Sequence, residues 1–271
     1  MQELFLIMPG TSDKEVWAQP LRGGLPKKLE LTAEPWEVLR LDLSDSPLRV
    51  YSLYSPKKYP PKDRLFRAAG KKLRYGKGQK ILVPAPPASG KTTLMHKIGK
   101  SIMETKKAYV TNIMIDERPE ETLYGKTINL NYMRSSKDIL EGMMAALGQV
   151  MLRVTEKGTD EVVIIDSLTR LIQVVNTIVQ QEYPDLPSGT GGISLQARKF
   201  VRQIFGLGNR LPKGSLTIIA TSLVGGSPIE DVIYKDLQGV STAEIFIRKG
   251  PDGEVIIDPN KSYVRNQHQI I

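Results

Sequence analysis

One stretch of the sequence, "KILVPAPPASGKTTLMHKIGKSI" at residues 80–102, constrains the fold more than any other. It begins with an apolar run, passes through Pro and small residues to Gly-Lys-Thr at 90–92, and continues with apolar residues at every fourth position from Leu94 to Ile102. The first run is typical of a buried strand, and the last has the spacing of an amphipathic helix. A strand, a tight loop and a helix in this order direct backbone N–H groups at the helix N-terminus, which binds phosphate. The sequence therefore predicts a phosphate-binding loop, although Ala85 replaces the first glycine of the G-x-x-x-x-G-K-[ST] pattern.

The alternation of apolar runs along the rest of the chain predicts the sheet to which this loop belongs. From about residue 78, β-rich runs such as "AYVTNIMID", "EVVIID" and "LTIIATSL" alternate with segments of helical period. Strands that are apolar throughout and are separated by helices form a parallel sheet covered on both faces. We therefore expect an α/β fold with a mainly parallel sheet over residues 69–271, the larger of two domains.

The first part of the chain does not follow this pattern. It contains both tryptophans, short alternating runs such as "LRVYSLY", and the stretch "SPKKYPPKDR", which can neither stay helical nor enter a central strand. We expect residues 1–68 to form a small β-rich N-terminal domain that ends in a linker.

Composition excludes several classes of chemistry. The 271 residues include no cysteine and two histidines, so disulfides and thiolate metal sites are excluded and a zinc site is disfavoured. No apolar run reaches the length of a membrane span, and "MQELFLIMPG" lacks a basic leader region, so we expect a cytoplasmic protein without a membrane partner. The formal net charge of +9 favours a polyanionic partner such as nucleic acid.

A bound nucleoside triphosphate explains the residues of the loop and of a second strand end. We expect Lys91 to reach the β- and γ-phosphates, Thr92 to offer its hydroxyl to Mg²⁺, and Asp166, at the end of "EVVIID", to hold the same ion. ATP and Mg²⁺ are the predicted cofactors. The predicted phosphate-binding residues are Pro87, Ala88, Ser89, Gly90, Lys91, Thr92 and Thr93.

A third acidic strand end, "IMIDERPEE", supplies the candidate general base. A carboxylate at the edge of a strand beside the loop can polarise the water that attacks the γ-phosphate. Glu117 is the candidate, with Asp116 and Glu120 as alternatives.

These motifs together resemble one known family. "VPAPPASGKTTLMHKIGKSI", "IDERPEE", "VVIIDSLTRLIQVVNT", "GTGG" and "GSLTIIATSL…IEDVIYKDLQG" are similar, in this order, to the C-terminal motor domain of the Rho family of transcription termination factors. The resemblance runs from about Gly76 to about Arg265. It implies a RecA-type P-loop NTPase core that assembles as a homo-hexameric ring and binds ATP between subunits.

The resemblance also assigns roles to residues outside the phosphate loop. It implies that Arg118 and Arg170 respond to the γ-phosphate and that Arg248, in "AEIFIRKG", is the arginine finger offered to the neighbouring subunit. Because the alignment is loose by one residue there, Lys249 competes for that role. Leu237 takes the place of the family's aromatic residue beside the adenine.

This sequence departs from the Rho family in the two loops that contact RNA. Rho grips RNA with two channel loops that each carry a lysine, whereas this chain has Pro187 in "EYPDLPSGTGG" and Pro228 in "LVGGSPIEDV" at the corresponding places. Since lysine and arginine contacts to phosphate supply most sequence-independent affinity, these loops weaken the case for RNA in the channel. Part of the positive charge is expected on "RKFVRQIFGLGNRLPK", a basic helix that begins at Arg198.

Three hypotheses follow. The first is a Rho-like ring ATPase that couples Mg²⁺-dependent ATP hydrolysis to translocation on nucleic acid, with single-stranded RNA favoured. The second is a ring ATPase that acts on DNA or on a protein partner, and the altered channel loops favour it. The third is a nucleotide-binding scaffold or regulatory protein that does not translocate, which the intact set of ATPase residues disfavours.

Overall fold

The computed structural model describes residues 2–7, 16–20, 27–29, 38–42, 49–54, 64–68, 73–116, 124–130, 135–211 and 213–270. A central sheet is built from β8 (Lys80–Ala85), β9 (Tyr109–Met114), β10 (Lys126–Asn129), β11 (Asp160–Asp166), β12 (Asn209–Arg210), β13 (Ser215–Leu223), β14 (Ala243–Glu244) and β17 (Tyr263–Val264). Its eight strands follow the order β10-β9-β11-β13-β8-β14-β17, with β12 paired to β13. Neighbours from β10 to β14 run parallel, whereas β17 and β12 run antiparallel.

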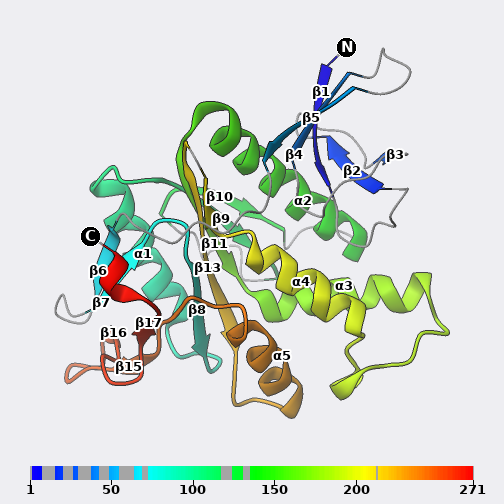
Figure 1. Ribbon diagram of the computed structural model, residues 1–271. Coiled ribbons are helices and arrows are strands. Elements are labelled where there is room, and N and C mark those ends of the chain that lie inside the picture. Colours follow the sequence, from blue (N-terminus) through cyan, green and yellow to red (C-terminus); the bar gives the residue numbers. More distant parts are fainter. Residues whose placement is uncertain are drawn as a thin grey trace.

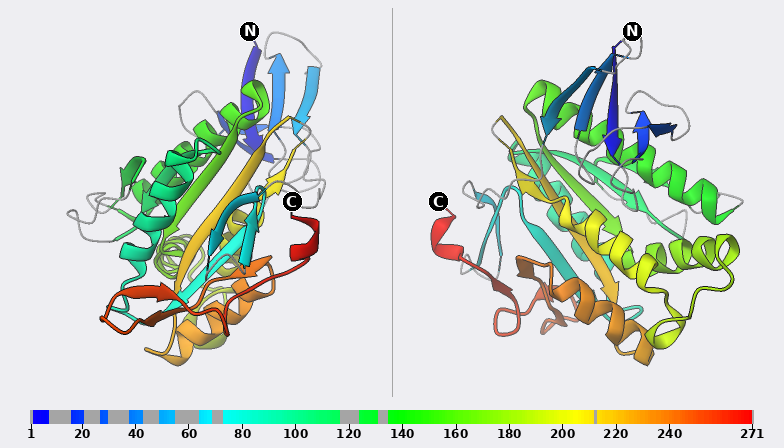
Figure 2. Two further views of the ribbon diagram at one scale, coloured as in Figure 1. Left: turned by 90° about the vertical axis from the view of Figure 1, so that its left-hand side faces the viewer. Right: turned by 45° about the vertical axis from the view of Figure 1, so that its right-hand side comes forward.

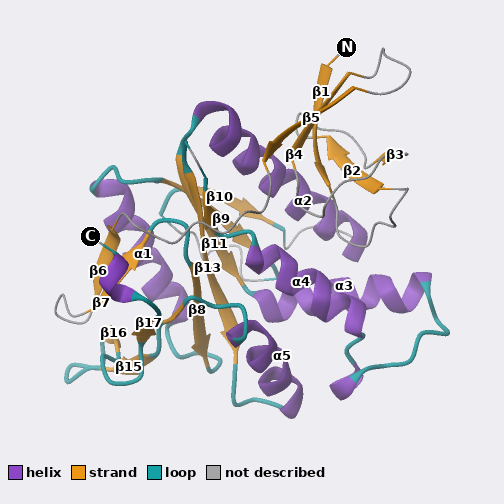
Figure 3. Ribbon diagram, in the orientation of Figure 1, coloured by secondary structure: helices purple, strands orange, loops and turns teal. Residues whose placement is uncertain are grey.

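Helices cover both faces of this sheet, as Figures 1 and 3 show. They are α1 (Lys91–Glu104), α2 (Ser136–Leu152), α3 (Leu168–Glu182), α4 (Leu195–Gly206) and α5 (Pro228–Gln238), with short helical turns η1 (Arg153–Lys157), η2 (Thr190–Gly192) and η3 (Gln267–Gln269). One hydrophobic cluster packs α1 against one face of the sheet. A second, larger cluster packs the four helices α2, α3, α4 and α5 against the opposite face. The mainly parallel α/β sheet expected from the sequence is confirmed.

The burial along β11 shows why the sequence pattern predicts this sheet. Val162 and Ile164 lie in the cluster with α1, while Val163 and Ile165 lie in the cluster with the other helices. All four side chains are fully buried. Each such side chain contributes about 1.5–3 kcal/mol relative to exposure, so a strand that is apolar at every position is stable only between two helical layers.

A separate antiparallel sheet lies at one end of the molecule in both views of Figure 2. Its strands are β1 (Gln2–Ile7), β2 (Val16–Pro20), β3 (Lys27–Leu29), β4 (Val38–Asp42) and β5 (Arg49–Tyr54). The order is β3-β2-β1-β4-β5, and β2 contacts α2 of the larger domain. The described part of the first 54 residues is therefore β-structured, in agreement with its alternating sequence.

A β-hairpin connects the two sheets along the chain. It consists of β6 (Arg64–Ala68) and β7 (Leu73–Gly76), and Leu65, Phe66 and Tyr75 are buried in the cluster with α1. The division of the chain at residue 68 remains a prediction, because the end of the predicted N-terminal segment packs with the core of the larger domain.

Between β14 and β17 of the central sheet, the chain forms a second hairpin beside α1. It is formed by β15 (Ile247–Lys249) and β16 (Val255–Ile257), and β16 contacts α1. None of the helices in the described part of the chain is long and apolar enough to cross a membrane.

Candidate nucleotide site

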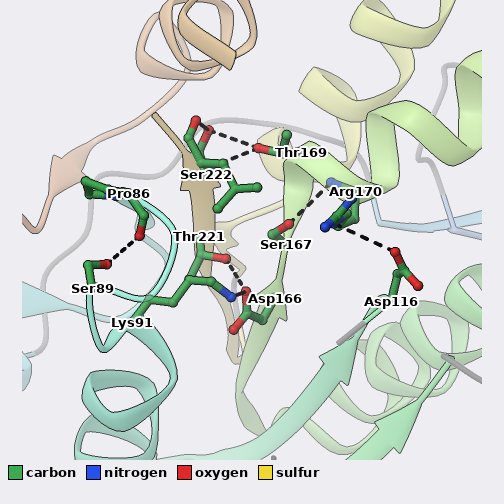
Figure 4. A network of polar contacts seen from close by, with 11 residues as sticks. Pro86, Ser89, Lys91, Asp116, Asp166, Ser167, Thr169, Arg170, Thr221 and Ser222 are labelled. Carbon is green, nitrogen blue, oxygen red and sulfur yellow. Dashed lines mark hydrogen bonds and ion pairs between the residues drawn. The ribbon is translucent and has the colours of Figure 1, made fainter. Parts of the chain in front are cut away.

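The loop between β8 and α1 has the backbone form that phosphate binding requires. Gly90 is the N-cap residue of α1, with φ 89°, and no side-chain hydrogen bond caps the helix there. Ala88 also has positive φ, at 55°, and the Ser89 hydroxyl donates to the Pro86 carbonyl at 2.6 Å (Figure 4). A Cβ on residue 90 would lie 2.3 Å from Cγ2 of Val255, so both the backbone and the space require glycine there.

Three polar side chains from three elements meet below this loop, as Figure 4 shows. The Lys91 ammonium donates to Oδ1 of Asp166 at 2.8 Å, and the Thr221 hydroxyl donates to the same oxygen at 2.6 Å. Lys91 and Asp166 are buried, with relative exposures of 8% and 0%. Charge-assisted hydrogen bonds of this kind are about twice as strong as neutral ones, so they fix the lysine at the base of the loop.

The second oxygen of the Asp166 carboxylate is free to bind a Mg²⁺ ion at this place. Oδ2 of Asp166 is buried and has no hydrogen-bond partner. A buried unpaired carboxylate oxygen is costly unless it binds a ligand, and Mg²⁺ takes one or two carboxylates together with phosphate oxygens and waters. Thr92, half-buried in the first turn of α1, is the second protein oxygen at this place. Among the described residues, no group of three or more His, Cys, Asp or Glu side chains could hold a metal ion.

The neighbouring strand end brings Asp116, an alternative candidate for the general base, close to Asp166 and Arg170. The N–H of Ile115 donates to the Asp166 carbonyl at 2.7 Å, so the ends of β9 and β11 lie side by side. Asp116 follows with φ 53°, and its Oδ2 lies 3.8 Å from Nε of Arg170 (Figure 4). Glu117 and Arg118, with the alternative base Glu120, lie outside the described residues.

Arg170 lies in the first turn of α3, four residues after Asp166. Its side chain is 40% exposed, and its Nε makes no hydrogen bond, although Nη1 donates to Gln173 at 3.3 Å. Ser167 caps α3 by accepting from the N–H of Arg170. The response of Arg170 to a γ-phosphate stays a prediction.

The sequence reasoning missed the polar end of β13. Thr221 and Ser222 close the apolar run "LTIIATSL", and Ser222 lies 3.4 Å, oxygen to oxygen, from Thr169, whose hydroxyl accepts from the N–H of Leu223. The signal was present as two hydroxyl residues at the end of a buried strand, but it locates the site only once β13 is known to lie between β11 and β8.

The remaining predicted nucleotide contacts lie in different surroundings. Arg248 and Lys249 are exposed on the β15–β16 hairpin, and the Arg248 guanidinium donates to the Lys249 carbonyl. Leu237, expected beside the adenine, is instead fully buried with Ile233 in the core under α5, because it lies on the apolar face of that helix. Its side chain therefore offers no surface to a base.

The two loops aligned with the family's channel loops lie together. A Cβ on Gly191 would lie 3.0 Å from the side chain of Ile229, one residue after Pro228. Pro187 is exposed and Pro228 is the first residue of α5. Tyr183 and Leu186 are exposed on the first loop, at 62% and 38%.

Comparisons with known proteins show which proteins this chain resembles. No family model matches the chain. It is 34% identical over 221 residues to transcription termination factor Rho of Cereibacter sphaeroides, which covers 78% of this chain and 52% of that protein. The Rho protein of Aquifex aeolicus is 33% identical over 202 residues, which covers 70% of this chain and 45% of that protein. The chain thus spans about half the length of the curated relatives it matches.

Solved structures show the same fold at lower identity. An ATPase from the type III secretion system of pathogenic bacteria has a TM-score of 0.67 at 18% identity and covers 92% of this chain and 73% of that one. The ATP synthase subunit NeqB of Nanoarchaeum equitans has a TM-score of 0.68 at 13% identity and covers 100% of this chain and 79% of that one. These likenesses confirm the predicted RecA-type fold, and together with the identity to Rho they establish that the chain contains an ATPase domain of the Rho family.

Proposed function

We propose that this protein is a ring-forming ATPase that couples Mg²⁺-dependent ATP hydrolysis to translocation on single-stranded RNA. The observation that carries the proposal is the cluster of Lys91, Asp166 and Thr221 at the start of α1, with one carboxylate oxygen left open. Likeness to Rho supports RNA as the polymer and a homo-hexamer as the assembly.

The chain's own residues divide the chemistry among them. Lys91 exchanges its bond with Asp166 for one with the β- and γ-phosphates, while the N–H groups after Gly90 bind the same oxygens. Asp166 and Thr92 would hold Mg²⁺, which when bound neutralises charge on the phosphates. Glu117 would accept the proton of the attacking water.

The proposed arginines complete the site. Arg170, beyond Asp166, would contact the γ-phosphate from within the chain. Arg248 would reach the nucleotide of the neighbouring subunit, since its side chain is exposed on the β15–β16 hairpin. An arginine supplied in this way is worth about 10³–10⁵ in turnover, so hydrolysis should require the assembled ring.

Hydrolysis by the purified protein at fixed low salt, with and without single-stranded RNA or DNA, tests the proposal. We expect MgATP hydrolysis that RNA stimulates and that disappears in Lys91→Ala. Hydrolysis that no nucleic acid changes would refute the RNA part, and an assembled ring without hydrolysis would refute the ATPase part.

A second candidate is a ring ATPase that acts on a polypeptide. The channel loops carry exposed Tyr183 and Leu186 beside exposed Asp185, and Leu195 at the start of α4 is 68% exposed. Apolar and acidic groups suit an unfolded, basic polypeptide better than a phosphate backbone. Stimulation by such a polypeptide, with none by RNA, would favour this candidate.

A further inference from the structure

The positive charge of the chain is concentrated where the resemblance to Rho does not place it. The 17-residue segment 64–80 contains seven Lys or Arg residues and no Asp or Glu, against a formal net charge of +9 for all 271 residues. The seven are Arg64, Arg67, Lys71, Lys72, Arg74, Lys77 and Lys80. The described parts of this segment include β6, β7 and the start of β8, and β6 contacts α1.

The hairpin separates its apolar and basic side chains. Phe66 and Tyr75 are stacked with ring centroids 4.6 Å apart, and both are buried against α1. Arg67 and Arg74 are directly opposite each other on the paired strands, and Arg67 is exposed. Like charges directly opposite in a sheet are destabilising, so this pair is unfavourable in the free protein.

The end of α1 adds cations to the same region. The Lys107 ammonium donates to the Arg64 carbonyl at 3.1 Å, which places the end of α1 against β6. Burial, and then the neighbouring charges of Arg64, Lys77 and Arg67, lower the pKa of Lys107. Lys106 is exposed beside it. We call Arg64, Arg67, Arg74, Lys77, Lys106 and Lys107 the basic hairpin surface.

Few of these charges are neutralised within the described part of the chain. Lys77 forms an ion pair with Asp160 at 2.7 Å. No described acidic residue forms an ion pair with Arg67 or Arg74. The surface is therefore a concentration of cations that would gain from a ligand with several regularly spaced negative charges.

An exposed aromatic ring stands next to this surface. Tyr109, two residues after Lys107, begins β9 and is 64% exposed. Aromatic side chains beside a basic groove stack the bases of single-stranded nucleic acid, and each stacked base contributes to affinity without selecting sequence.

We propose that the basic hairpin surface binds single-stranded RNA, with the arginines and lysines on its phosphates and Tyr109 stacked on a base. The inference rests on the proposed function for its choice of RNA over other polyanions. The surface lies near the first residues of β8 and β9, whereas the nucleotide loop follows the last residue of β8. The two sites therefore occupy opposite ends of the same strands, and RNA is held outside the channel loops that lack lysine.

Binding is tested without ATP, so that a failure of hydrolysis leaves the result intact. The anisotropy of a labelled oligouridylate of about 16 nucleotides is titrated with wild-type protein and with Arg67→Gln/Arg74→Gln at several salt concentrations. The matched control is Lys199→Gln/Arg202→Gln, which removes the same charge from exposed positions of α4. Thermal unfolding and hydrolysis without RNA report whether each variant is folded.

We expect the hairpin variant to lose at least about tenfold in affinity, with the slope of log K against log salt reduced by about 1.4, or 0.7 for each lost phosphate contact. The control should change affinity by no more than about twofold, because charges beyond the screening length of about 8–10 Å contribute little. Tyr109→Ala should weaken binding, and Tyr109→Phe should retain it.

Equal losses in the hairpin and control variants would overturn the proposal, since they would reflect net charge alone. An unchanged affinity in the hairpin variant would overturn it as well. Anionic phospholipid vesicles serve as the competing polyanion, and binding of wild-type protein to them but not to RNA would assign the surface to a membrane instead.

Discussion

The buried pair of Lys91 and Asp166 gives a quantitative prediction for the nucleotide-free protein. Lys91→Met would leave the Asp166 carboxylate, which is fully buried, with the Thr221 hydroxyl as its remaining donor. Asp166→Asn would leave the Lys91 ammonium, which is 8% exposed, beside a neutral amide. Removing one partner of a buried pair costs about 3–5 kcal/mol, because the other charge remains uncompensated.

The double variant Lys91→Met/Asp166→Asn contains neither charge. We expect it to be more stable than either single variant, because replacing a whole buried pair is far less costly than breaking it. Equilibrium urea unfolding without nucleotide measures the free energies of all four proteins. Lys100→Met is the control, since it makes the same change on α1 at an exposed pair with Glu104, which is worth about 0.3–0.5 kcal/mol.

Nucleotide supplies the second half of the assay. Saturation with MgATP at 100 times its Kd should raise the free energy of unfolding of wild type and of Lys100→Met by about 2.7 kcal/mol. Lys91→Met should gain nothing, because the ammonium that leaves Asp166 for the phosphates is missing. If the losses of unfolding free energy in the two single variants added up in the double variant, the two charges would not be coupled. If MgATP stabilised Lys91→Met as much as wild type, the proposed move of the Lys91 ammonium from Asp166 to the phosphates would be refuted.

Three further predictions concern the surroundings of this pair. Gly90→Ala should lower the free energy of unfolding, measured in urea, by on the order of 1–2 kcal/mol through its positive φ alone. The added Cβ would also collide with Val255, and combining Gly90→Ala with Val255→Ala should remove that collision but not the backbone strain. Arg248→Ala should lower steady-state hydrolysis by about 10³-fold or more while leaving ATP affinity intact, and if Lys249→Ala has that effect instead, Lys249 is the finger. Glu117→Gln should reduce single-turnover hydrolysis by about 10²–10⁴-fold at unchanged ATP affinity, and full activity would exclude it as the base.

The sequence indicates that Lys91 and Asp166 lie near each other because the signals for both are local, and the structure places the two side chains in contact. The loop before Lys91 and the acid at Asp166 each follow an apolar run, and parallel strands bring their ends to one edge of the sheet. Thr221 was missed because its role depends on strand order, which an isolated run does not encode. The structure places β13 between β8 and β11, and this strand order brings the Thr221 hydroxyl to the Asp166 carboxylate.

Burial bears on two other expectations, the contact of Leu237 with adenine and the assignment of the segment that begins at Arg64. Leu237 was placed beside the adenine by position in a motif, but its helical spacing with Ile233 puts it on the buried face of α5. Residues 64–68 are assigned to the N-terminal part because they end the segment that contains the linker-like stretch "SPKKYPPKDR". Their apolar side chains pair across a hairpin and pack on α1, which requires a long-range contact that local pattern does not specify.

Locally unfavourable backbone and charge arrangements coincide with the two proposed sites. The described residues other than glycine with positive φ are Ala88, Lys106, Asp116 and Asn266. Ala88 lies in the phosphate loop, Asp116 faces Arg170, and Lys106 belongs to the basic hairpin surface, which also carries the opposed Arg67 and Arg74. Natural sequences tend to break local rules at functional sites and to offset the cost elsewhere. The buried strands between the two ends of the sheet supply that offset, so the same rigid strands that hold the nucleotide loop also hold the surface assigned to RNA.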